Sequence, residues 1–194
     1  MPTTVLDRDQ WLEMPEPSKD ETDYDGRTLL CGFIDTPIGC FGVVKHSLGL
    51  VQCAFGDHMD DLSYPMIQTY SPDWYIMRDD RVAAEVWENA MSYKPQPLSF
   101  CVSGTPFQLS AWKALRHVPV GKTFSYLEFA TVMGKAWAVR AIATAIANNP
   151  FALVVPCHRI IRADGTYGEY RWGAKRKEWL IHNELKHLYG EFAF

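Results

Sequence analysis

The sequence predicts an α+β fold in which a small domain of antiparallel sheet and helix precedes a mainly helical domain with a helix-turn-helix. We expect an acidic arm at residues 1–26, the first domain at 27–98 and the second at 99–194. Short apolar runs separated by glycine-containing turns fill the first half, a pattern typical of antiparallel strands. In the second half, helix start and stop signals flank apolar residues spaced three or four apart, which predicts short helices.

Composition limits the class of protein. The 194 residues are 47% hydrophobic and 13% aromatic, enough for a buried core in one large or two small domains. No apolar run is long enough to span a membrane, and the N-terminus lacks the basic-then-apolar pattern of a secretion signal. Five irregularly spaced cysteines do not fit a disulfide framework and favour a reducing compartment inside the cell, the cytoplasm or, in a eukaryote, the nucleus.

The charges are divided unevenly along the chain. Residues 1–103 contain 7 Lys and Arg against 17 Asp and Glu, a net charge of -10, and residues 104–194 contain 12 against 6, a net charge of +6. Such an asymmetry hints at nucleic-acid binding by the basic half. An ordinary uneven distribution explains the counts equally well, so specific motifs must decide.

The acidic arm has only Arg8 and Lys19 as cations, and its composition predicts little regular structure. Trp11 and Leu12 can anchor part of this arm on the folded body. Three strand-like runs follow, and the turn signals between them predict an antiparallel meander. These runs span residues 28–34, 40–45 and 50–55.

A helix is expected after Asp80, ending near Tyr93, with Val82, Val86 and Ala90 on its apolar face. The segments beside this helix are residues 57–75, which fit neither a helix nor a strand clearly, and the proline-containing linker 94–98.

Four metal-binding residue types gather in the first half, at Cys31, Cys40, His46 and Cys53. No pair has the C-x-x-C spacing of a zinc site, and three of the four lie in apolar strand patterns. We therefore interpret them as core residues and predict no metal.

The second half opens on a strong helix signal. Thr105 is placed as an N-cap, Pro106 as the first helical residue and Gln108 as the partner that completes a capping box. This helix should end near His117. Its buried residues should be Phe107, Trp112 and Leu115.

A second capping box, Ser125 to Glu128, opens a helix that should end at Met133, before Gly134. A further helix is expected at residues 137–148, with Val139, Ile142 and Ile146 inward. Two short helices joined by a glycine-containing turn form a helix-turn-helix candidate, which would place Arg140 in the first turn of the second helix.

The run Val-Val-Pro-Cys-His-Arg, which contains Cys157, is the candidate for covalent chemistry. A thiolate is the nucleophile in such chemistry, and the basic neighbours His158 and Arg159, at the mouth of a buried strand, are expected to lower the pKa of the thiol. On this hexapeptide alone, a structural cysteine that ends a core strand is the slightly better interpretation.

Residues 162–173 are rich in glycine, charge and aromatics, and are expected to form an extended loop beside a pocket. A final helix at 174–187 would place Leu180, Glu184 and Leu188 on one face. A carboxylate on an inward face needs a partner, and a histidine would supply one. A half-exposed glutamate at the rim fits the pattern about as well.

These motifs occur together in one known family. Residues 104–184 resemble the C-terminal domain of the 6-O-alkylguanine-DNA alkyltransferases, and the first half resembles more loosely the α/β domain that precedes it. The matching runs are GTPFQLSAWKAL, PVGKTFSYLEFA, AVRAIATAIANNP, VVPCHRIIRADG, GEYRWG and RKEWLIHNE.

The resemblance implies a role for each matching residue. Cys157 would accept the alkyl group, His158 would activate it through a water molecule, Glu184 would orient His158, and Asn149 would be the hinge asparagine that precedes the active-site strand. For DNA binding it implies Arg140 as the finger that replaces an extruded base, Tyr126 as the residue that promotes rotation, and Ala138. For the substrate pocket it implies Tyr170, Arg171, Trp172 and Ile160.

The same resemblance implies a partner and a reaction. The partner would be double-stranded DNA that carries 6-O-alkylguanine or 4-O-alkylthymine, bound through the minor groove by a monomer. The nucleotide would be flipped out, since a buried sulfur cannot reach a paired base. Transfer to Cys157 would be irreversible and would need no cofactor, metal or membrane.

The sequence departs from the family pattern at the loop. Arg171 and Trp172 stand where some relatives carry small residues, which predicts a narrower pocket, and Glu169 adds a negative charge where glycine or asparagine is frequent. The zinc ligands that some relatives carry in the first domain are not matched. Alternatives are a damage sensor that does not repair, against which Cys157 argues, a helix-turn-helix regulator, and, more distantly, a cysteine hydrolase.

Overall fold

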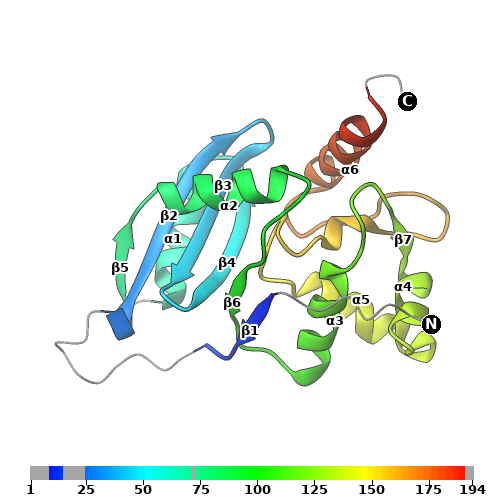
Figure 1. The fold of residues 1–194 in the computed structure, drawn as a ribbon, viewed down its shortest axis with the longest axis horizontal. Coiled ribbons are helices and arrows are strands. Elements are labelled where there is room, and N and C mark those ends of the chain that lie inside the picture. The colour runs from blue at the N-terminus through cyan, green and yellow to red at the C-terminus, as the bar shows by residue number, and fades with distance from the viewer. Residues whose placement is uncertain (1–8, 15–24, 71–72, 191–194) are drawn as a thin grey trace. The chain divides into compact units, whose positions relative to one another are not determined.

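We describe a computed structural model of the chain at residues 9–14, 25–70 and 73–190. The chain divides into two compact units, Met1–Ser103 and Gly104–Phe194, and most of their helices and strands are labelled in Figure 1. The division falls five residues after the boundary expected at 98/99, because Ser99–Cys101 forms a strand of the first unit's sheet. No helix within the described ranges is long and apolar enough to span a membrane.

The first unit contains a six-stranded sheet with the order β1-β6-β4-β3-β2-β5. The predicted meander forms its centre, as antiparallel pairing joins β2 to β3 and β3 to β4. Three further strands that the sequence did not indicate extend it by parallel pairing. The strands are β1 (Gln10–Leu12), β2 (Thr28–Thr36), β3 (Gly39–His46), β4 (Gly49–Gly56), β5 (Tyr75–Arg78) and β6 (Ser99–Cys101).

Two helices, α1 (Met59–Tyr70) and α2 (Arg81–Met91), cover opposite faces of this sheet (Figure 1). On one face Gly42 allows Met66 of α1 to approach, and on the other Gly32 allows Val82 of α2 to approach. Val82 and Val86 are buried as predicted, whereas Ala90 is only half-buried. The ambiguous segment 57–75 is therefore mostly helix α1, and its last residue begins β5.

The arm is more ordered at residues 10–12 than expected. Trp11 stacks on Phe100 with ring centroids 4.3 Å apart, and β1 pairs with β6. The expectation that Trp11 anchors the arm is confirmed, and the expectation of little regular structure is wrong for these three residues. The rest of the predicted arm, apart from residues 9, 13, 14, 25 and 26, lies outside the described residues.

The cysteines and histidine considered as metal ligands lie in the core of the first unit. Cys31, Cys40 and Cys53 are buried free thiols in the strands, and His46 is buried at the end of β3. In the part of the chain that the structure describes, no three His, Cys, Asp or Glu side chains gather as a metal site.

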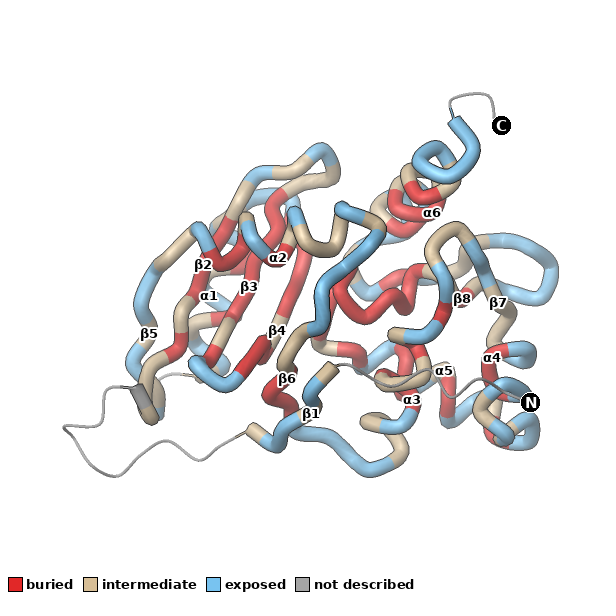
Figure 2. Tube along the Cα trace, in the orientation of Figure 1, coloured by how far each residue is buried: buried red, intermediate tan, exposed pale blue. Residues whose placement is uncertain are grey.

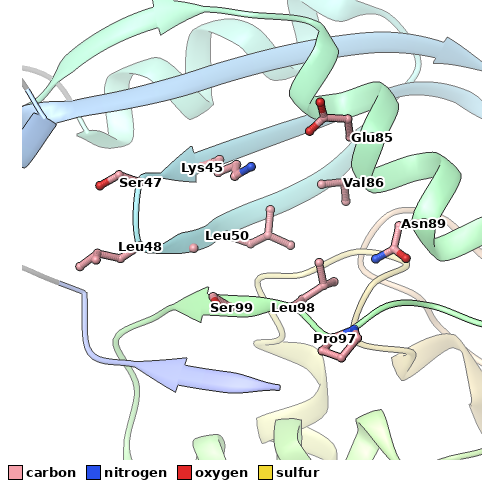
Figure 3. A pocket seen from close by; sticks show the side chains of 11 residues that line it. Lys45, Ser47, Leu48, Leu50, Glu85, Val86, Asn89, Pro97, Leu98 and Ser99 are labelled. Atoms are coloured by element: carbon pink, nitrogen blue, oxygen red, sulfur yellow. The ribbon is translucent and has the colours of Figure 1, made fainter. Parts of the chain in front are cut away.

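A pocket in the first unit lies between the β3–β4 turn, α2 and the segment that leads into β6 (Figure 3). Lys45 and Glu85 contribute charges and Leu50 and Val86 contribute apolar surface. Its lining contains no cysteine or histidine.

The second unit is mainly helical, with a short parallel pair of strands, β7 (Phe124–Ser125) and β8 (Ile160–Ile161). Both predicted capping boxes are present, at Thr105 with Gln108 and at Ser125 with Glu128. The helices are α3 (Pro106–Arg116), α4 (Tyr126–Val132), α5 (Val139–Ala147) and α6 (Ala174–Tyr189), with a 3-10 turn at Ala136–Ala138 before α5.

Helices α4 and α5 form the predicted helix-turn-helix, and Gly134 has the positive φ of 68° that ends α4. Trp112 and Leu115 of α3 are buried as expected, and the Trp112 indole donates a hydrogen bond to the carbonyl of Ala145 at 2.8 Å. Burial of Phe107 and Val139 is only partial, in contrast to the expectation.

Candidate active site

The residues before the candidate nucleophile form a tight turn rather than the strand that the apolar run suggested. Residues 152–155 are turns and a bend, and Leu153 has a positive φ of 66°. The chain reverses direction here because a buried side chain forms hydrogen bonds with the backbone of the turn. Figure 2 shows the segment 151–158 as one buried stretch.

That side chain belongs to Asn149, which is fully buried. Its amide nitrogen donates to the carbonyls of Phe151, at 3.2 Å, and Val155, at 2.9 Å, and its oxygen accepts from the amide of Phe151 at 2.9 Å. The same nitrogen lies 3.2 Å from the sulfur of Cys157. Asn149 therefore positions both the turn and the sulfur.

Cys157 begins a 3-10 turn, Cys157–Arg159, and is 5% exposed. Burial raises the pKa of this thiol to about 11, against the opposing effects of the Asn149 hydrogen bond and the charges of Lys177 and Arg171. The expectation that basic neighbours lower its pKa is wrong, because His158 and Arg159 both turn toward Glu184. A thiol of this kind reacts only if a base removes its proton.

Glu184 is buried on α6 and has the histidine partner that its position called for. Nε2 of His158 lies 2.8 Å from Oε1 of Glu184. Arg159 contacts the carboxylate through two nitrogens, with Nε at 3.0 Å and Nη2 at 2.9 Å from Oε1. Gly121 donates its amide to Oε2 at 2.9 Å. The alternative of a half-exposed rim glutamate is excluded.

The protonation of this pair follows from its surroundings. Burial favours the neutral carboxyl, but the hydrogen bonds from His158 and Arg159 and the charge of Arg159 outweigh it and hold the pKa of Glu184 at about 2. Burial lowers the pKa of His158, against the effect of Glu184, so the ring is neutral at pH 7.

A carboxylate only accepts hydrogen bonds, so the single ring proton of neutral His158 must sit on Nε2. Nδ1 then carries a lone pair, and this buried atom has no hydrogen-bond partner among the described residues. The imidazole is therefore arranged as a base that faces away from Glu184.

Lys177 is a site residue that our sequence reasoning missed. Its ammonium is buried, donates to the carbonyl of Ile160 at 2.6 Å, and interacts electrostatically with Cys157. Burial lowers the pKa of Lys177 to about 8. Helical periodicity could have revealed it, because Lys177 lies seven residues before Glu184, on the same buried face of α6.

The predicted pocket residues differ in their placement. Tyr170 is buried, and burial together with the proximity of Cys157 raises its pKa well above the usual value. The ring centroids of Tyr170 and Trp172 are 5.1 Å apart. The guanidinium carbon of Arg171 lies 5.8 Å from the ring centroid of Trp172. Ile160 is fully buried, so its side chain offers no exposed pocket wall.

The predicted DNA-binding residues lie on the helix-turn-helix. Tyr126 is the first residue of α4 and is half-buried; burial raises its pKa, with a smaller contribution from Cys157. Arg140 is exposed in the first turn of α5, while the side chain of Ala138 is buried.

This arrangement contains a nucleophile, a base and a group that orients the base, which is the usual requirement for covalent catalysis. The buried carboxylate of Glu184 and the half-buried guanidinium of Arg159 neutralise one another, and the lone pair on Nδ1 of His158 is left available. The chemistry that fits is transfer of a group to sulfur.

The comparisons with known proteins agree with this geometry. Residues 106–186 match the family model described as 6-O-methylguanine DNA methyltransferase, DNA binding domain. A methylated-DNA–protein-cysteine methyltransferase of Methanosarcina barkeri is 35% identical over 158 residues, which cover 80% of this chain and 96% of that protein.

A second relative is the bifunctional transcriptional activator and DNA repair enzyme Ada of Escherichia coli. It is 47% identical over 92 residues, which are 47% of this chain but only 26% of Ada. The Mycobacterium tuberculosis protein solved in complex with DNA superposes with a TM-score of 0.64 at 29% identity, over 80% of this chain and 92% of that one.

Proposed function

Because the chain belongs to the 6-O-methylguanine DNA methyltransferase family, we propose that it repairs DNA by transferring an alkyl group from 6-O-alkylguanine to Cys157. The observation that carries the proposal is the buried Cys157 with His158 next to it, whose Nε2 is held by Glu184 at 2.8 Å. Relatives named as methyltransferases and a relative solved with DNA support it.

The proposed reaction begins with loss of the thiol proton. A water molecule would carry this proton from Cys157 to Nδ1 of His158, and Glu184 would stabilise the imidazolium that forms. The thiolate then attacks the alkyl carbon and the carbon–oxygen bond breaks. The guanine, which stays in the DNA, takes up the proton that the imidazolium of His158 returns through water. Lys177 supports this step, because its charge stabilises the thiolate.

No cofactor or metal takes part in the proposed reaction. The product is a thioether, which is stable and which no neighbouring group can cleave. Each molecule would therefore react once.

The lesion must leave the duplex before it reaches the sulfur. We assign Arg140 to fill the gap and Tyr126 to promote rotation, with α5 in the minor groove, where sequence readout is weak. Tyr170 would form a wall of the pocket, and Arg171 and Trp172 would narrow it. The protein would act as a monomer, inside the cell, and 4-O-alkylthymine is a second expected substrate.

Radiolabelled methyl groups test the proposal directly. A duplex with labelled 6-O-methylguanine is incubated with the protein and with the Cys157→Ser variant. We expect one label per protein molecule, bound to the peptide that contains Cys157, and none on the variant. Labelled methanol or repeated turnover would contradict the proposal. Lesion binding without transfer would instead favour the damage-sensor or regulator alternatives.

A further inference from the structure

Trp137 is the most exposed large hydrophobic residue that the structure describes, at 86%. It lies in the 3-10 turn Ala136–Ala138, directly before α5 and three residues before Arg140. No described ring or cation–π pair includes it. A bare indole at the start of the second helix of a helix-turn-helix is unusual, since such rings are normally at least partly buried.

The indole continues the exposed face of α5. Residues three or four apart share a helix face, and the residues exposed after Trp137 are Arg140, Ala141, Thr144, Ala147 and Asn148. This face, which we call the α5 stripe, consists of those five residues and Trp137. It contains no acidic residue, and its small side chains would let a surface approach closely.

The turn that carries Trp137 is rigid enough to present it. The amide of Lys135 donates to the carbonyl of Ala130 at 2.8 Å, and the amide of Ala138 donates to the carbonyl of Lys135 at 2.7 Å. Ala138 is buried beneath the turn. The backbone thus holds the indole outward, next to a cation, and none of the ring or cation–π pairs among the described residues occupies its face.

We propose that Trp137 packs against the deoxyribose wall of the DNA minor groove beside the extruded nucleotide, as a second contact next to Arg140. The inference rests on the proposed repair function. Apolar and aromatic side chains that enter the minor groove are a recurrent means of holding distorted DNA, and aromatic contacts of this kind tolerate any sequence. Trp137 would supply affinity without charge, and Arg140 would supply the electrostatic part.

The test measures binding to a short duplex with one 6-O-methylguanine, in the Cys157→Ser background so that the lesion persists. We expect Trp137→Ala to weaken binding about tenfold, and Trp137→Phe, which keeps an aromatic ring, to weaken it no more than about threefold. The control is Tyr189→Ala, an exposed aromatic at the end of α6, which should bind like the parent.

Salt separates the two contacts. Trp137→Ala removes an apolar contact and should leave unchanged the slope of the logarithm of the DNA-binding constant against the logarithm of the salt concentration. Arg140→Ala should reduce the magnitude of this slope by about one. In the protein that retains Cys157, Trp137→Ala should lower the rate of alkyl transfer to different extents with the two substrates. The loss with the duplex should be about tenfold greater than the loss with free 6-O-benzylguanine.

Duplex affinity of Trp137→Ala within about twofold of the parent would overturn the inference, as would equal losses on duplex and free base. Unchanged affinity for the short duplex combined with lost clustering on a long one would also overturn it, and would identify a second copy of the chain as the partner. If Cys157 accepts no alkyl group at all, the proposed function fails, and the Trp137 binding result remains a separate measurement.

Discussion

At the scale of single residues, Glu184 organises the site. Its two oxygens accept from His158, from Arg159 and from the amide of Gly121. Removing one member of a buried, hydrogen-bonded ion pair leaves the other charge unpaired, which costs far more than the pair contributes. The carboxylate therefore affects both the base and the stability of the unit.

Replacement of Glu184 by Gln should destabilise the protein by about 3 kcal/mol at neutral pH, because the half-buried Arg159 loses its counter-charge. The pKa of Glu184, about 2, lies below its ordinary value of 4.5. Its stabilising effect is therefore complete above the ordinary pKa and is lost as the pH falls toward 2. Urea unfolding at pH 7 and pH 3 should show a smaller difference between parent and variant at the lower pH.

The matched control is Glu178→Gln, an exposed position on the same helix, which should unfold like the parent at both pH values. A penalty for Glu184→Gln that is the same at both pH values would argue against the depressed pKa.

The sequence revealed some of these residues and concealed others for a physical reason. Helical periodicity made an inward Glu184 about as well supported as a half-exposed one at the rim, and the need of an inward carboxylate for a partner pointed to a histidine. Lys177 shares that periodicity but was not considered, because lysine is rarely fully buried. The partner of Arg159 was not predicted, because no motif or periodic pattern links Arg159 to Glu184, 25 residues further along the chain.

At the scale of elements, local signals proved the most informative. The capping boxes at Thr105 and Ser125 involve atoms three residues apart, so the sequence contains all that they need. The parallel strands β1, β5 and β6 depend on partners far along the chain, and short runs such as Ser99–Cys101 have no pattern of their own. The run before Cys157 was predicted as a strand because the role of Asn149, which folds it into a turn, is not visible in apolar content.

Thr105→Ala should destabilise the second unit by about 1 kcal/mol, because the amide of Gln108 loses its side-chain acceptor. Urea denaturation measures the loss, and amide hydrogen exchange should locate it in the first turn of α3. Ser110→Ala, at an exposed position in the same helix, is the control and should change stability by less than about 0.5 kcal/mol. Faster exchange throughout the helix in the control would remove the cap as the cause.

At the scale of the whole molecule, the two units differ in charge and in chemistry. The first, with a net charge of -10, contains four buried cysteines, and the second, with +6, contains Cys157. Burial raises the pKa of Cys31 to about 11, as it does for Cys157. Acidity therefore does not distinguish the nucleophile from a core thiol, and the distinction must come from His158, Glu184 and Lys177.

Incubation of the native protein with 6-O-benzylguanine should place a benzyl group on Cys157 and on no other cysteine. After denaturation in urea, iodoacetamide should then modify the remaining four thiols and leave Cys157 protected. Peptide mass mapping reads both results. Benzylation of Cys31 or Cys53 would show that burial and a high pKa, rather than the arrangement of the base, control reactivity.

The contact between Gly121 and Glu184 has a consequence for how the protein can vary. Gly121 has no side chain, yet its amide helps to hold the carboxylate, and its φ of 70° is one that other residues rarely adopt. A methyl group there would also require the end of the exposed Leu188 side chain to move. We therefore expect position 121 to tolerate as few substitutions as the nucleophile position, Cys157. The backbone carbonyl of Val118 also accepts from Arg159, but every amino acid supplies that atom, so this contact by itself does not restrict the side chain at position 118.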